Sequence, residues 1–148
     1  MNDEPTQLAF PAPGERLAPH HANAETLALL SRRRSTVALA MNEPGPSAEQ
    51  VDQLIAIASR VPDHGKLAPW RFIVFQGEAR TRFGQILGQV FQAKTPNASE
   101  EQVAFEPGRF ERAPLGIGVL SSVTESHKIP EWEQILSARV PCPTPSFA

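Results

Sequence analysis

Residues 60–72 read RVPDHGKLAPWRF, and this stretch decides how the chain around it is organised. Pro62 and Pro69 bracket a loop, because proline cannot continue a helix. The segment that follows, 70–75, is aromatic and β-branched and apolar on both faces, which predicts an internal strand. Arg60 and His64 lie at the helix end and in the loop, where ligand-contacting side chains often occur. Taken alone, a turn with a surface histidine explains this motif more simply.

Two helices are predicted before this loop. Ser47 and Gln50 form a capping box, and the apolar residues that follow recur on one helical face, so a helix is expected over 47–58. Asn23 is a favoured N-cap residue and predicts the start of an earlier helix. The arginines at 32–34 suit the C-terminal end of that helix, because the helix dipole is negative there.

The basic run at the end of the first helix is a candidate anion site. Arg33, Arg34 and Ser35 together offer forked guanidinium donors and a hydroxyl, which can hold a phosphate. The alternative is a solvated basic helix end, stabilised by the dipole, and spacing alone favours that alternative.

The second half of the chain predicts one more strand between two helices. A helix is expected over 78–91, then a polar and irregular loop or lid over 93–108. The segment 115–121 is apolar and reads as a strand, whose glycines suggest close approach of another backbone or a ligand. Pro130 stands at a natural helix start and predicts a helix over 131–138.

The two ends of the chain differ from its middle. Four prolines forbid a regular helix in the N-terminal segment, so residues 1–22 are expected to form a flexible, Pro-rich leader. The composition changes abruptly at about Ala138, and every second residue from Pro141 to Pro145 is proline. We therefore expect a folded region over 23–138 and an unrelated Pro-rich tail over 139–148.

Composition excludes several classes of protein. The chain has 148 residues, of which 41% are hydrophobic, so it suits one domain with a packed core. A net charge of -2 argues against a nucleic-acid binder. The apolar runs are far shorter than a membrane helix, and there is no signal peptide, so a cytoplasmic protein is expected. A single cysteine, Cys142, and scattered histidines predict no metal site.

Taken in order, these segments resemble the flavin-dependent nitroreductase family, in its short branch of NAD(P)H nitroreductases. Residues 29–35, LLSRRRS, resemble the family's N-terminal RRS signature. The 60–72 stretch resembles that branch's R-x-P-D-H-x-x-x-x-P-W-x-F pattern and is the most specific part of the match. Residues 112–114 and 127–134, RAP and HKIPEWEQ, continue it, so the resemblance covers about 25–138.

The resemblance implies an α+β, nitroreductase-like fold that works as a homodimer with two FMN molecules at its interface. NAD(P)H would reduce each flavin, and a nitroaromatic, quinone or similar acceptor would oxidise it. By position, Arg33, Arg34 and Ser35 would hold the phosphate and ribityl end, while Arg60 and His64 would reach the flavin of the partner chain. A flavin carries its own hydride chemistry, which agrees with the lack of an obvious nucleophile or acid–base pair.

The chain departs from the family after the 131–138 helix, since residues 139–148 resemble nothing in it. We hypothesise a truncated or frame-shifted nitroreductase domain, incomplete at its C-terminus. Lost core would matter, because domains are stable by only about 5–15 kcal/mol, and such a chain alone is expected to bind FMN poorly. The alternative function is an inactive remnant, or an interaction partner of a full-length homologue.

Overall fold

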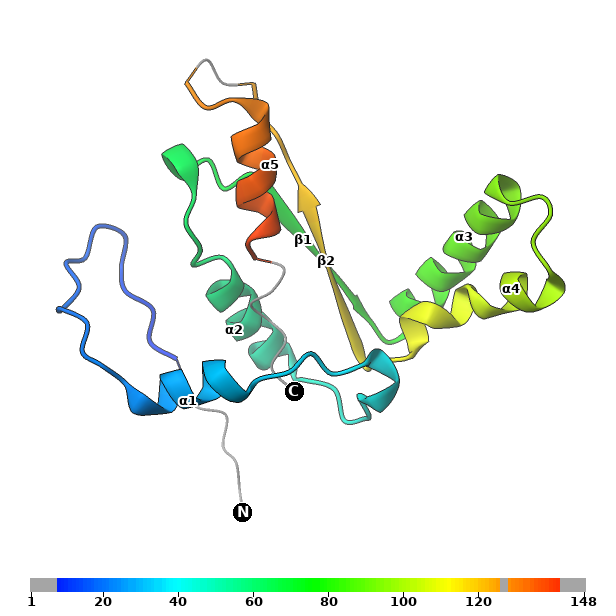
Figure 1. Cartoon of the computed structure of the whole chain (residues 1–148), viewed down its shortest axis with the longest axis horizontal. Helices are drawn as coiled ribbons and strands as arrows, with labels where there is room; N and C mark the ends of the chain where they lie inside the picture. Colours follow the sequence, from blue (N-terminus) through cyan, green and yellow to red (C-terminus); the bar gives the residue numbers. More distant parts are fainter. Residues whose placement is uncertain (1–7, 126–127, 142–148) are drawn as a thin grey trace.

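The computed structural model describes residues 8–125 and 128–141. Figure 1 shows a long antiparallel pair of strands, called the hairpin below although helices join its two strands, with helices at both of its ends. In chain order the elements are α1 (Ala24–Arg32), η1 (Ala38–Ala40), α2 (Ala48–Ala58), η2 (His64–Lys66), β1 (Trp70–Gln76), α3 (Glu78–Lys94), α4 (Glu100–Phe105), η3 (Pro107–Glu111), β2 (Leu115–Ser121) and α5 (Glu131–Arg139). The predicted helices and both predicted strands are confirmed, mostly to within a few residues.

The hairpin joins β1 and β2 in antiparallel register, with Trp70 opposite Ser121 and Gln76 opposite Leu115. Within the described residues these two strands make up the whole sheet, so the expectation that β1 is internal is wrong for this part of the chain. The apolar residues of β1 are instead partly buried at some positions on each face of the strand. The β2 glycines do permit a close approach, because a Cβ at Gly118 would lie 3.3 Å from the Phe75 ring.

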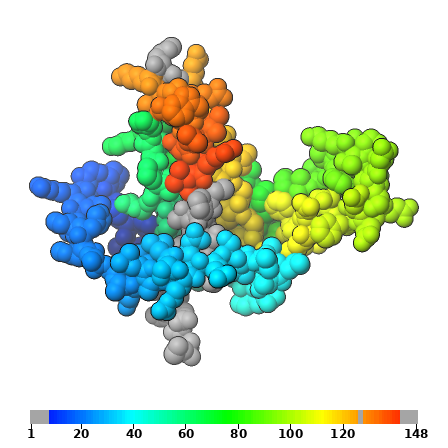
Figure 2. Space-filling view, in the orientation of Figure 1, coloured from blue at the N-terminus to red at the C-terminus, as the bar shows by residue number. Residues whose placement is uncertain are grey.

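A helical arm of α3, α4 and η3 projects from one end of the hairpin (Figure 2). The loop predicted over 93–108 is wrong in part, because this segment contains α4, whose capping box pairs Ser99 with Gln102. The arm packs on an aromatic cluster, in which Phe75 lies 4.5 Å and 5.1 Å from the ring centroids of Phe83 and Phe110.

Two glycines of α3 allow η3 to pack closely against that helix. A Cβ at Gly84 would lie 2.1 Å from the Pro107 carbonyl oxygen, and one at Gly88 would lie 2.8 Å from the Pro107 ring. Both positions therefore need a residue without a side chain for η3 to pack against α3. Neither position has a positive φ, so their role is close approach rather than backbone conformation.

The N-terminal half is well capped and loosely packed. Asn23 accepts a hydrogen bond from the Thr26 backbone N–H, and the predicted capping box of Ser47 and Gln50 is present. Yet α1 has no buried residue. Among the described residues the buried hydrophobic side chains are few, namely Val51, Ala58 and Ala138. The few buried apolar side chains thus lie on α2 and α5.

Residues 8–23 contain no helix or strand, and residues 1–7 lie outside the described ranges, so the flexible leader over 1–22 stays a prediction. Arg139, the first residue of the predicted tail, still belongs to α5. Residues 142–148, with Cys142, and His127 of the HKIPEWEQ motif lie outside the described residues. Every helix that the structure describes is too short or too polar to cross a lipid bilayer.

Candidate functional site

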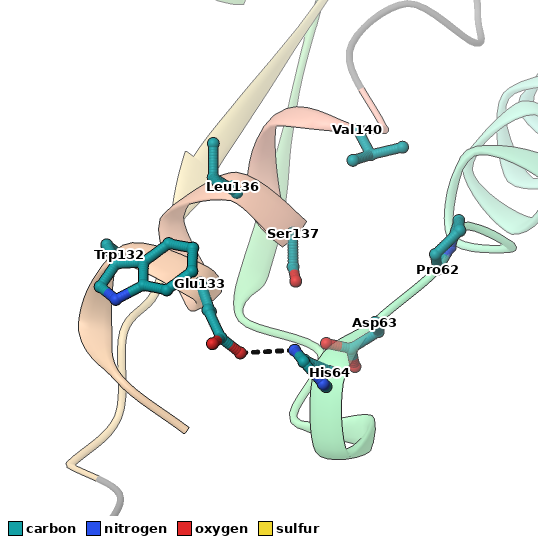
Figure 3. Close-up of a pocket in the computed structure, with 8 residues that line it drawn as sticks. All are labelled: Pro62, Asp63, His64, Trp132, Glu133, Leu136, Ser137 and Val140. Atoms are coloured by element: carbon teal, nitrogen blue, oxygen red, sulfur yellow. Dashed lines mark ion pairs between the residues drawn. The ribbon is translucent and has the colours of Figure 1, made fainter. Parts of the chain in front are cut away.

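A pocket of about 480 Å³ lies between the η2 loop and α5 (Figure 3). One wall is apolar and comes mainly from α5, while acidic, hydroxyl and imidazole groups face it from both elements. The lining residues are Pro62, Asp63, His64, Trp132, Glu133, Leu136, Ser137 and Val140. The RVPDHGKLAPWRF stretch and the HKIPEWEQ motif, far apart in sequence, therefore meet at one place.

The loop that carries His64 has an unusual backbone. Gly65, Lys66 and Ala68 all have positive φ, of 74°, 55° and 45°. Such values are uncommon for residues with a side chain, and they persist only where the surroundings hold them. Asp63 supplies part of that hold, since its Oδ2 accepts a hydrogen bond of 2.7 Å from the Ala68 N–H.

The same loop contacts the segment between β2 and α5 on both sides of Lys66. Pro69 is fully buried, and its carbonyl accepts a 2.8 Å hydrogen bond from the Ser122 N–H just beyond β2. A Cβ on Gly65 would lie 3.1 Å from the Ile129 side chain. The loop is thus built as one unit with the segment that leads into α5.

Gln134 fixes α5 in place. Its side-chain amide accepts from the Thr124 N–H at 3.0 Å and donates to the carbonyls of Thr124 and Ile129 at 2.9 Å and 3.1 Å. The residue is only 2% exposed. Because a buried amide must satisfy its hydrogen-bonding groups, these three bonds hold the β2–α5 connection against the helix.

His64 and Glu133 form a direct contact across the pocket, between Nδ1 of the imidazole and Oε2 of the carboxylate (Figure 3). The histidine side chain is 67% exposed, whereas that of Glu133 is 21% exposed. Of the residues at this contact, only His64 was predicted as a site residue from the sequence. Glu133 and Gln134 stand in the HKIPEWEQ motif, but as single positions they look like ordinary polar residues of a surface helix.

The other predicted site residues lie away from this pocket. Arg33, Arg34 and Ser35 follow α1 and are exposed, and Arg60 is exposed but does not line the pocket. Within the described part of the chain, no ion pair engages these arginines. None of residues 33–35 lines the pocket that His64 lines, so the basic run and the pocket are separate features of the single chain.

The pocket's exposed donors and acceptors suit binding and positioning rather than nucleophilic chemistry. Ser137 is the one hydroxyl in the lining, and the imidazole of His64 is engaged by Glu133. In the described ranges no three His, Cys, Asp or Glu side chains gather as a metal ion would require. Asp63 contributes one further feature, because its second oxygen, Oδ1, is buried without a hydrogen-bond partner.

Comparison with known proteins gives consistent matches. The profile described as "Nitroreductase family" matches residues 30–139. The Escherichia coli K12 protein named "Putative NAD(P)H nitroreductase YdjA" is 40% identical over 116 residues, which cover 77% of this chain and 60% of that protein. A similarly named NAD(P)H nitroreductase from Haemophilus influenzae is 36% identical over 115 residues, with the same two coverages. The chain thus spans about 60% of the length of the curated relatives it matches.

The fold comparison agrees. A solved structure of a nitroreductase-like family protein from Bacillus cereus superposes with a TM-score of 0.62 at 16% sequence identity. The superposition covers 88% of this chain and 65% of that one. At this identity the likeness shows a shared fold.

Proposed function

The chain belongs to the nitroreductase family and has its mixed α+β fold, as the motifs predicted, and from this we propose that it is a flavin-dependent oxidoreductase chain. Its reaction takes hydride or electrons from NAD(P)H through FMN to nitroaromatic, quinone or similar acceptors. The observation that carries the proposal is the family match over 30–139, combined with an exposed basic run at 32–35 that no acidic side chain of the described residues neutralises.

The donor set fits FMN. Arg33 and Arg34 supply planar, permanently charged donors and Ser35 adds a hydroxyl, which is the chemistry that a dianionic phosphate requires. When bound, FMN supplies the hydride and electron chemistry, and the protein orients it and excludes water. Arg60 and His64 are proposed to contact the flavin held by a second chain, which agrees with the absence of residues 33–35 from the pocket that His64 lines.

A homodimer is part of this proposal. The side chains of Leu27, Leu30 and Leu39 are 64%, 57% and 74% exposed in the single chain. Apolar surface of this kind, beside the proposed phosphate site, favours cover by another protein chain. A dimer would bury it and bring the basic run of one chain toward the η2 loop of the other.

Flavin titration with size-exclusion chromatography tests cofactor and assembly together. Since the incomplete domain is expected to bind FMN poorly by itself, we expect weak quenching of FMN fluorescence by a dimeric species. The affinity should fall by about a further tenfold or more in the Arg33→Ala, Arg34→Ala double variant. Arg82→Ala, an exposed arginine on α3, is the matched control and should leave affinity unchanged. Equal affinities for all three proteins would contradict the phosphate assignment.

A second candidate is an interaction partner without activity of its own, which pairs with a full-length homologue. The same exposed leucines of α1 favour it. Co-expression with a full-length relative separates the two functions. Flavin retained by the chain alone supports the enzyme, and flavin retained only in the mixed assembly supports the partner. Absence of flavin from both preparations overturns both.

A further inference from the structure

We infer that Glu133 is a positioning residue that fixes the tautomer and orientation of His64, so that Nε2 is the imidazole nitrogen presented to a ligand. The ligand side of this inference rests on the proposed function, in which His64 contacts a flavin bound by a second chain. The contact itself is a property of the single chain and can be tested without flavin.

The contact determines which nitrogen carries hydrogen. An ionised carboxylate only accepts hydrogen bonds, so Nδ1 of His64 must be the donor to Oε2 of Glu133. In the neutral imidazole the remaining nitrogen, Nε2, is then an acceptor. Figure 3 shows the second ring nitrogen of His64 on the side of the ring away from Glu133.

Glu133 is the better anchored partner of the two. It lies in the first turn of α5, next to Gln134, whose three hydrogen bonds hold that helix to the preceding loop. His64 lies in a single turn of 3-10 helix that has no side-chain cap. A side chain that is 67% exposed on such a turn would otherwise sample several rotamers, and Glu133 removes that freedom.

The remaining charged group of the pocket does not compete for this role. Asp63 lines the same cavity, but its Oδ2 is engaged by the Ala68 N–H and its Oδ1 is buried. Glu133 is therefore the carboxylate that contacts the imidazole. Nε2 offers an acceptor to a hydroxyl or imide N–H, groups that the ribityl chain and ring edge of a flavin carry.

The first test reads the tautomer in the flavin-free chain. Nitrogen-15 NMR at alkaline pH, with His64→Gln to identify the signal, should report His64 mainly as the Nδ1–H form. Glu133→Ala should shift it toward the Nε2–H form, which an unrestrained imidazole prefers. Glu131→Ala, an exposed carboxylate in the same helical turn, is the control and should change nothing. An unchanged His64 spectrum in Glu133→Ala overturns the inference.

The second test is a double-mutant cycle on FMN affinity. We expect Glu133→Ala to weaken binding by about three- to tenfold, the loss typical of one oriented hydrogen bond, and to have no further effect in a His64→Gln background. Equal losses in both backgrounds indicate a merely structural role and overturn the inference. If the unaltered chain binds no FMN, alone or with a full-length relative, the proposed function fails, and the NMR result alone decides whether Glu133 positions His64.

Discussion

The α1 and α5 helices have the same length, and they use opposite means of stabilisation. Asn23 caps α1 with a side-chain hydrogen bond, but none of its residues is buried. No side chain caps α5 at Pro130, yet Gln134, Ser137 and Ala138 are buried. Capping signals therefore predict that a helix forms, but they do not predict what it packs against. The two helices also differ in proposed role, since α1 leads into the donors proposed for the FMN phosphate and α5 completes a pocket within its own chain.

The largest expected effect is on the α5 side. Gln134→Ala removes three hydrogen bonds to the backbone groups of Thr124 and Ile129 and takes away the acceptor of the Thr124 N–H. We expect the free energy of unfolding to fall by about 2–4 kcal/mol, as for loss of buried hydrogen bonds with unsatisfied groups. Urea unfolding followed by circular dichroism measures it. Gln89→Ala, an exposed glutamine of α3, should change stability little. Similar losses in both variants would show that Gln134 contributes no more to stability than an exposed glutamine does.

The cap of α1 should matter less. Asn23→Ala removes the acceptor for the Thr26 N–H, which lies 2.9 Å from Asn23 Oδ1. Such a change costs about 1 kcal/mol of helix stability. Since α1 is not packed in the single chain, the loss should appear as local fraying, measured by amide hydrogen exchange over 24–32, while the urea midpoint stays unchanged. A shifted midpoint would show that α1 is coupled to the core.

A still smaller effect on the single chain is expected from Leu30→Ser. The Leu30 side chain is 57% exposed, so its replacement should change the free energy of unfolding by no more than about 0.5 kcal/mol. The proposed dimer, in contrast, should dissociate more readily, which analytical ultracentrifugation would detect. Thr81→Ser on the arm is the matched control, and dimer affinity that is unchanged in Leu30→Ser would contradict the proposed role of α1.

The smallest effect concerns α2, which lies between these two regions in the sequence. The backbone N–H of Glu49 and the Ser47 hydroxyl hydrogen-bond its carboxylate and hold the pKa of Glu49 below the usual 4.5. The stabilisation is therefore present above that value and is lost as the pH falls through the lowered pKa. Acidification should weaken the start of α2 in the unaltered chain more than in Glu49→Gln, as followed by exchange of the Gln50 amide. An equal response of both proteins would rule out this carboxylate as the cause.

The sequence predicted the helices and strands well because their signals are local. Ser47 with Gln50, and Pro62 with Pro69, act within a few residues of their own position, and the structure confirms the elements that they bound. One local signal was missed, since Ser99 and Gln102 form the same kind of capping box within a stretch predicted to be irregular. The error arose from reading polarity as disorder in a helix that buries little surface.

What the sequence alone determined is therefore the order and extent of the elements, the family, and the identity of His64 as a candidate site residue. Only the tertiary structure decided that the motifs at 60–72 and 127–134 share one pocket, that Glu133 contacts His64, and that Gln134 is buried. The physical reason is range: caps, prolines and periodicity act between near neighbours in the chain. The partner of a side chain in another element depends on the path of the intervening hairpin, which no short pattern specifies.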